Sequence, residues 1–189
     1  MALGGERSFS APAKRSDLEI LPESQRFSVG PAADSDLPEL AAMLAAHIPN
    51  LQGTYLAFEQ AHRHSRSILA IRNSNGLVGC FAALFLNNGG FERLVDGSLS
   101  IVEPSQSYLV RPGETAAALY VWAICMPKMA VSATGNAFDW LRQDAYAKAD
   151  LYARPGTPKG KTFMIRVGFQ PLADSDGKSL WVYRRRMES

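Results

Sequence analysis

The chain has 189 residues, of which 47% are hydrophobic and 20% are charged, and its formal net charge is +2. This length and composition predict a globular protein that hides roughly 70% of its unfolded surface, and they exclude a disordered chain. The small net charge argues against nucleic-acid binding, which requires clustered Lys and Arg side chains. Because no segment approaches about 18 unbroken apolar residues, we expect a cytoplasmic protein without a membrane partner.

Hydrophobic periodicity and turn residues divide the chain into strands and helices. Residues 1–23 follow no period and predict a flexible N-terminal arm, so a single domain is expected at residues 24–189. The most apolar segment, 115–126, is hydrophobic at both alternating sets of positions, which is typical of a central strand covered on both faces. Before this central strand we expect a strand at 25–29, helices at 37–48 and 55–62, and a hairpin of strands at 67–72 and 77–86. A variable stretch at 91–113 follows the hairpin, with short strands at 99–102 and 108–110. After the central strand we expect a loop at 128–134, a helix at 135–149, a strand at 151–153, a helix at 158–167 and a closing hairpin of strands at 169–172 and 180–184.

The last expected helix has clear signals at both ends. Thr157 can cap its N-terminus and Pro158 fits its first turn. Gly168 is suited to the left-handed position that ends a helix, and Phe169 can pack back against it. The central strand, the helix after it and the strand at 151–153 form one βαβ unit, so we predict an α/β fold with a mixed sheet flanked by helices.

The cysteines and histidines predict neither a nucleophile nor a metal site. Cys80 and Cys125 lie in apolar stretches, where a thiol behaves as a small hydrophobic side chain. His62 and His64 are two positions apart, a spacing that points them to different sides of a helix, and no third ligand accompanies them. We therefore expect no metal cofactor.

The order of the elements over residues 25–184 resembles the GNAT superfamily of acyl-CoA N-acyltransferases, and two local segments extend the resemblance. The first segment, 123–137, leaves the central strand and enters a helix through short side chains. In that family the amides of this loop and the helix N-terminus hold the CoA pyrophosphate, since the first amides of a helix have no internal partners. The resemblance implies that acetyl-CoA or another acyl-CoA is bound by the main chain of Ile124 and Met126 and by Val131, Ser132, Ala133, Thr134, Gly135, Asn136 and Ala137.

The family's Arg or Gln, which precedes a Gly-x-Gly or Gly-x-Ala pattern, has no counterpart here. One register places Ala133 and Gly135 at the two glycines, with Ala130 in place of the Arg or Gln. A second register places Gly135 and Ala137 at the Gly-x-Ala pattern, with Ser132 in place of the Arg or Gln. Positive charge near the phosphates would then come from Lys128, Lys159 and Lys161.

The second segment, 150–169, resembles the family's penultimate strand, its final helix and the Gly-Phe that ends this helix. Thr157 lies where many members have an Asn that hydrogen-bonds the pantetheine arm of CoA. Met164 lies where many have the Tyr that protonates the departing thiolate, and Met cannot do so. The acid is then Tyr152 or water, although a packed aromatic is the simpler interpretation of Tyr152.

The resemblance implies direct transfer of an acyl group to an amine of a small molecule or peptide, and acetyl is the expected acyl group. The amine must lose a proton before it attacks, and Glu92 and Glu114 are the candidate bases, with a solvated loop charge as the simpler interpretation of each. The missing Arg or Gln leaves open a GNAT-like binding or regulatory domain that has lost the chemistry. The stretch at 91–113 is expected either to form a homodimer interface or to cover the acceptor cleft.

Overall fold

The computed structural model describes residues 27–47, 54–101, 103–130, 132–142, 145–172 and 180–185. The expected flexible arm at 1–23 lies outside these residues. The helices and strands are β1 (Ser28–Pro31), α1 (Leu37–His47), α2 (Thr54–Ser65), β2 (Ile68–Asn73), β3 (Gly76–Leu86), α3 (Asn88–Val95), β4 (Ala118–Cys125), α4 (Ala133–Trp140), β5 (Asp150–Ala153), α5 (Pro158–Val167), β6 (Gln170–Pro171) and β7 (Trp181–Tyr183).

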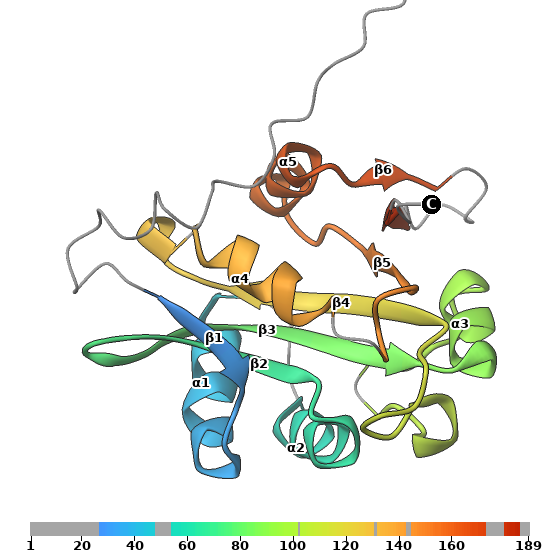
Figure 1. Cartoon of the computed structure of the whole chain (residues 1–189), viewed down its shortest axis with the longest axis horizontal. Helices are drawn as coiled ribbons and strands as arrows, with labels where there is room; N and C mark the ends of the chain where they lie inside the picture. Colours follow the sequence, from blue (N-terminus) through green and yellow to red (C-terminus); the bar gives the residue numbers. More distant parts are fainter. Residues whose placement is uncertain are drawn as a thin grey trace, which may run out of the picture.

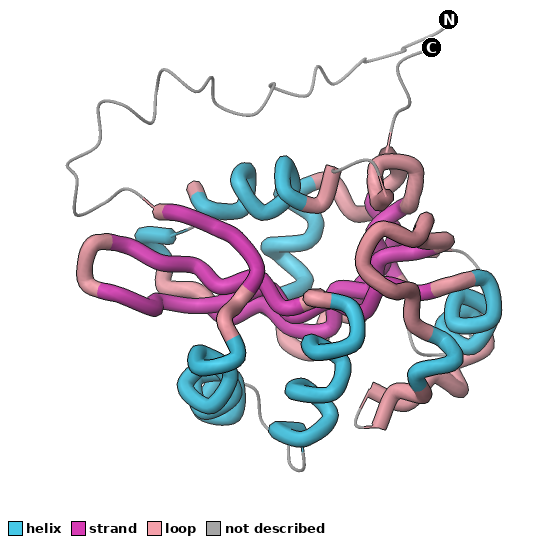
Figure 2. Tube along the Cα trace, turned by 60° about the horizontal axis from the view of Figure 1, so that its bottom comes forward, coloured by secondary structure: helices cyan, strands magenta, loops and turns pink. Residues whose placement is uncertain are grey.

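All these strands belong to one seven-stranded sheet with the order β1-β2-β3-β4-β5-β7-β6. Strands β4 and β5 are parallel, and the other neighbouring strands pair in antiparallel fashion. Helices α1 and α2 lie on one face of the sheet and α4 and α5 on the other, while α3 lies beyond one end of β3 (Figures 1 and 2). The predicted mixed sheet flanked by helices is confirmed. Within the described residues, no helix is long and apolar enough to cross a membrane.

The central position of β4 explains its uniformly apolar sequence. Leu119 and Val121 belong to the hydrophobic core that packs against α4 and α5. Ala118 and Tyr120, which alternate with them, belong to the core on the opposite face, beneath α2 and α3. A strand with a core on both faces has no solvent-facing positions for polar side chains, so the interpretation of residues 115–126 as a central strand is confirmed.

The helix expected at 135–149 is shorter than its apolar stripe suggests. Helix α4 begins earlier, at Ala133, and ends at Trp140, and residues 145–148 form turns instead. There the buried Tyr146 ring packs against Phe85, with 4.4 Å between ring centroids, and the Ala145 carbonyl accepts from the backbone N–H of Ala116. These tertiary contacts hold the same apolar residues against the core without a helical backbone, and the prediction was wrong on this point.

The stretch after β3 also differs from the expectation. Residues 88–95 form α3, whose first turn is capped by the Asn87 side chain, which accepts from the Gly90 N–H at 2.9 Å. Gly90 permits a close approach there, since a Cβ at this position would lie 2.4 Å from the Tyr108 carbonyl oxygen. The short strands expected at 99–102 and 108–110 are replaced, within the described residues, by a single bridge between Leu86 and Leu109.

The two ends of α5 are as predicted. The Thr157 side chain accepts from the Gly160 N–H at 3.0 Å. Gly168 ends the helix with φ of +99°, and the Phe169 N–H returns to the Met164 carbonyl at 2.9 Å. Local chemistry at both ends therefore sets the length of this helix, because a left-handed cap favours glycine.

Candidate functional site

The two parallel strands at the centre of the sheet pair over only part of their length. Their pairing runs from Ala118 and Asp150 to Val121 and Ala153, whereas β4 continues to Cys125. At this point the β3–β4 register shifts, because Ala82 faces Ala123 and Ala83 faces Val121. Trp122 is thus the extra residue of a β-bulge, a feature that bends and twists a strand. Beyond Trp122 and Ala153, β4 and β5 part.

Both parallel strands lead into helices at this same end of the sheet. The chain passes from Cys125 to α4 and from Ala153 to α5, so the N-termini of α4 and α5 both lie at the carboxyl ends of β4 and β5. Helix N-termini carry free amide donors and the positive end of the helix dipole. Ligand sites of open α/β sheets usually lie at the carboxyl ends of parallel strands. This end of the sheet is the candidate site.

Small side chains at the start of α4 allow the helix to pack closely on the sheet. Ala130, Ala133 and Ala137 are fully buried and pack in the core between α4 and the sheet. Ser132 is exposed. A Cβ at Gly135 would meet no atom within 4 Å, so the space beside this residue is open.

The other residues expected at this loop hold it in place. The Thr134 hydroxyl donates to the Met126 sulfur at 3.9 Å, and the Asn136 amide donates to the Phe27 carbonyl at 3.0 Å. These contacts attach the first turn of α4 to the residue that follows β4 and to the residue that precedes β1. The side chain of Ile124 packs against the same core, and Val131 lies outside the described residues.

On the α5 side, Thr157 is exposed and its hydroxyl oxygen already accepts from the backbone of Gly160. The hydroxyl proton is left to donate to another group. Met164 is buried against the core, with 5% of its surface exposed. Lys128 is exposed next to the turn before α4, and Lys159 is exposed on the first turn of α5.

Tyr152 lies on the opposite face of the sheet from α4 and α5. Its ring is buried and contacts Phe91 of α3, with 5.1 Å between centroids. Burial raises the pKa of Tyr152, nearby Asp150 raises it further, and Arg184 lowers it. The phenol is therefore protonated at neutral pH, as a proton donor must be, and it is also the packed aromatic that the sequence suggested.

Glu92 and Glu114 are not brought to this end of the sheet. Glu92 is exposed on α3, which follows β3, and β3 ends opposite the start of β4. Glu114 precedes β4, is exposed, and accepts from the Arg111 N–H at 2.9 Å. Both carboxylates therefore lie at the amino end of β4, while the divergence from β5 lies toward its carboxyl end.

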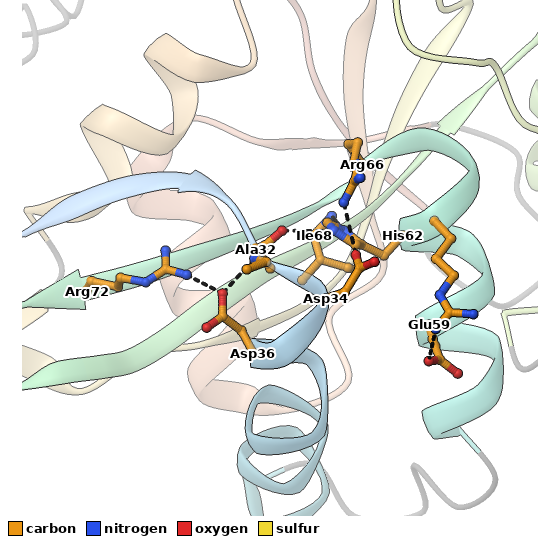
Figure 3. Close-up of polar contacts among 10 residues, drawn as sticks. Ala32, Asp34, Asp36, Glu59, His62, Arg66, Ile68 and Arg72 are labelled. Carbon is orange, nitrogen blue, oxygen red and sulfur yellow. Dashed lines mark hydrogen bonds and ion pairs between the residues drawn. The ribbon is translucent and has the colours of Figure 1, made fainter.

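The buried histidine has a structural role. His62 Nδ1 accepts from the Ile68 N–H at 3.2 Å, so Nε2 carries the proton that it donates to the Ala32 carbonyl at 3.0 Å (Figure 3). Two ion pairs, Arg66 with Asp34 and Arg72 with Asp36, lie around this contact. No group of three or more His, Cys, Asp or Glu side chains in the described part of the chain could hold a metal ion.

The cysteines face each other across β3 and β4, in surroundings that disfavour the thiolate. Cys80 and Cys125 are opposite each other in the register, and both are buried. Burial raises the pKa of both thiols, so the thiolate form that reacts as a nucleophile is disfavoured.

Two residues at the divergence of β4 and β5 escaped the sequence analysis. The indole N–H groups of Trp122 and Trp181 are buried, and neither has a hydrogen-bond partner among the described residues. Trp181 lies directly opposite Ala153, the last residue of β5 that pairs with β4. Both tryptophans occupy ordinary apolar strand positions, so the sequence holds no signal that sets them apart.

Several solved structures resemble this chain along most of its length. The loading GNATL domain of CurA from Lyngbya majuscula superposes with a TM-score of 0.60 at 11% identity, covering 84% of this chain and 98% of that one. An acetyltransferase of the GNAT family from Listeria monocytogenes gives 0.55 at 15% identity, covering 83% and 94%. Ard1 from Thermoplasma volcanium gives 0.51 at 10% identity, covering 82% and 94%. No protein-family model and no curated protein matches the sequence.

Proposed function

We propose that this chain, which has the GNAT fold, is an acyl-CoA-dependent N-acyltransferase that transfers an acetyl or other acyl group to an amine. The resemblance predicted from the sequence is confirmed at the level of the fold. The observation that carries the proposal is the parting of β4 and β5 at Trp122 and Ala153, with the N-termini of α4 and α5 at the same end. This arrangement offers space for an extended arm between two strands and amides for its phosphates.

The residues present suit an acyl-CoA. At the start of α4, Ser132 is exposed and the space beside Gly135 is open, so a pyrophosphate would approach the helix N-terminus without a large side chain in the way. Lys128 and Lys159 are exposed nearby and supply positive charge in place of the missing Arg or Gln. The unpartnered indole donors at the divergence match an arm that carries carbonyl acceptors.

The proposed chemistry depends mainly on positioning. The main chain of residues 124–126 aligns the thioester, and the amine nitrogen bonds to the acyl carbon while the carbon–sulfur bond breaks. The nitrogen loses its proton to solvent, and the departing sulfur takes one from Tyr152 or from water. Neither Glu92 nor Glu114 lies near this end of β4, so the amine acceptor is expected to enter in its neutral form.

The deciding experiment measures binding of acetyl-CoA and free CoA by calorimetry to the unmodified chain and to two variants. Gly135→Trp fills the open space at the start of α4 and should abolish binding. Gly135→Ala adds only a Cβ, which meets nothing within 4 Å, and should bind as the unmodified chain does. Equal binding by all three proteins would place the cofactor elsewhere.

A screen of amines for CoA release then separates the two hypotheses left by the sequence. Turnover with any amine supports the enzyme. Tight binding without turnover would favour a binding or regulatory domain that has kept the fold and lost the chemistry. No binding by the unmodified chain would refute the proposed function.

A further inference from the structure

Trp181 carries a buried donor for which the described part of the protein provides no acceptor. Trp181 is 7% exposed, and its Nε1 has no hydrogen-bond partner in that part of the protein. An indole N–H can only donate, and a buried donor left unpaired is destabilising because it has lost its hydrogen bond to water. An unpaired donor of this kind needs an explanation, and a ligand acceptor is one.

Trp181 lies on the face of the sheet covered by α4 and α5, whose N-termini the proposed function assigns to the phosphates of the cofactor. Trp181 packs in the core that includes Ala153 and Met164, on the face covered by α4 and α5. The Lys161 ammonium of α5 lies 5.8 Å from the centre of the indole ring. The neighbour across the strand pair, Ala153, is small and marks the point where β5 leaves β4. Only β5, at its small last residue Ala153, therefore separates Trp181 from the opening that the proposed function assigns to the pantetheine arm.

We propose that the Trp181 indole N–H donates a hydrogen bond to an amide carbonyl of the pantetheine arm of the acyl-CoA. The inference rests on the proposed function and adds a side-chain donor from β7 to a site otherwise built from β4, α4 and α5. Pantetheine provides two amide carbonyls, which are acceptors, along an apolar chain. Trp181 is thus a positioning residue that contacts the pantetheine arm and not the nucleotide end of the cofactor.

The three tryptophans of the chain allow a direct test. In a ¹⁵N-labelled protein each indole N–H gives one resonance, and Trp→Phe variants at positions 122, 140 and 181 assign them. Titration with CoA and with pantetheine should move the Trp181 proton downfield, as hydrogen bonding does. Adenosine 3′,5′-bisphosphate, which lacks the arm, should leave it in place. An unmoved Trp181 resonance in a protein that binds CoA would overturn the inference while leaving the proposed function intact.

Calorimetry gives the second readout. Trp181→Phe keeps the ring beneath Lys161 and removes the N–H, so its affinity for CoA should fall about tenfold, with the bisphosphate affinity unchanged. Trp140→Phe is the matched control, because Trp140 stacks on Phe85 and Tyr146 in the core, and it should bind both ligands normally. An equal loss for both ligands in Trp181→Phe would indicate a purely structural role, and failure of the unmodified chain to bind CoA would refute both proposals.

Discussion

Gly79 controls how closely β3 approaches the end of β4, and replacing it with Ala should both destabilise the protein and disturb the candidate site. A Cβ at position 79 would lie 2.1 Å from the Cys125 carbonyl oxygen and 3.1 Å from Met126 Cα. Side-chain carbons essentially never approach other atoms within 3.0 Å, so the two strands must separate by about 0.9 Å. Backbone atoms cannot rotate away as a flexible side chain would.

The magnitude follows from this forced separation. Overpacking of a well-packed region typically costs 1–3 kcal/mol, and a separation of this size also stretches the neighbouring ladder hydrogen bonds beyond useful length. We expect Gly79→Ala to lower the free energy of unfolding by about 2 kcal/mol, which corresponds to a fall in Tm of about 4–8 °C for a chain of this size. Urea denaturation and thermal melts measure both quantities.

Gly30→Ala is the matched control, since Gly30 also lies in a strand and its Cβ would meet nothing within 4 Å. That variant should be as stable as the unmodified chain or up to about 1 kcal/mol more stable. Because Gly79→Ala displaces the main chain of Cys125 and Met126, its affinity for acetyl-CoA should fall as well. Equal stability and equal affinity in the two variants would refute the reasoning about close approach.

Three further predictions test separate parts of the structure. Burial lowers the pKa of His62 in the folded chain, so the unfolded chain binds this proton more readily. The free energy of unfolding should therefore be highest above about pH 6.5 and should fall by at most about 1.4 kcal/mol per pH unit below that pH. Urea titrations should find this pH dependence weakened in His62→Gln. Thr157→Ala removes the cap of α5 and should cost about 1 kcal/mol in the same assay, whereas Thr157→Ser should cost little. If the Tyr152 hydroxyl protonates the departing thiolate, Tyr152→Phe should lower kcat at least about 100-fold with KM little changed, and an unaltered kcat would assign that proton to water.

Local signals predicted the parts of the fold that depend on local chemistry. Thr157 and Gly168 specify the ends of α5 because a cap needs only a side-chain acceptor at one end and a residue that accepts positive φ at the other. The same kind of local signal did not predict α3, which begins at Asn88 directly after β3 ends. Only contact with Tyr108 shows that Gly90 is the close-approach residue of a helix capped by Asn87.

Apolar periodicity has a similar limit. Helical spacing of apolar residues continues past Trp140 in the helix expected at 135–149, and it indicates which residues are buried; Leu141 and Ala149 are both buried. It does not specify the backbone, since turns held by the contact between Tyr146 and Phe85 bury the same side chains as a helix would. Burial is a property of side chains, whereas helix formation depends on which backbone hydrogen bonds the tertiary contacts allow.

The sequence by itself determined the strand and helix order outside residues 88–113, the buried central strand and the small residues at the start of α4, because each depends on nearby residues. Only the tertiary structure decided where β4 and β5 part, since the bulge at Trp122 depends on the register with β3. Tertiary structure likewise placed Trp181 beside Ala153, because β7 inserts between β5 and β6. Pairings between residues distant in sequence leave no local pattern, and the candidate site is built from such pairings.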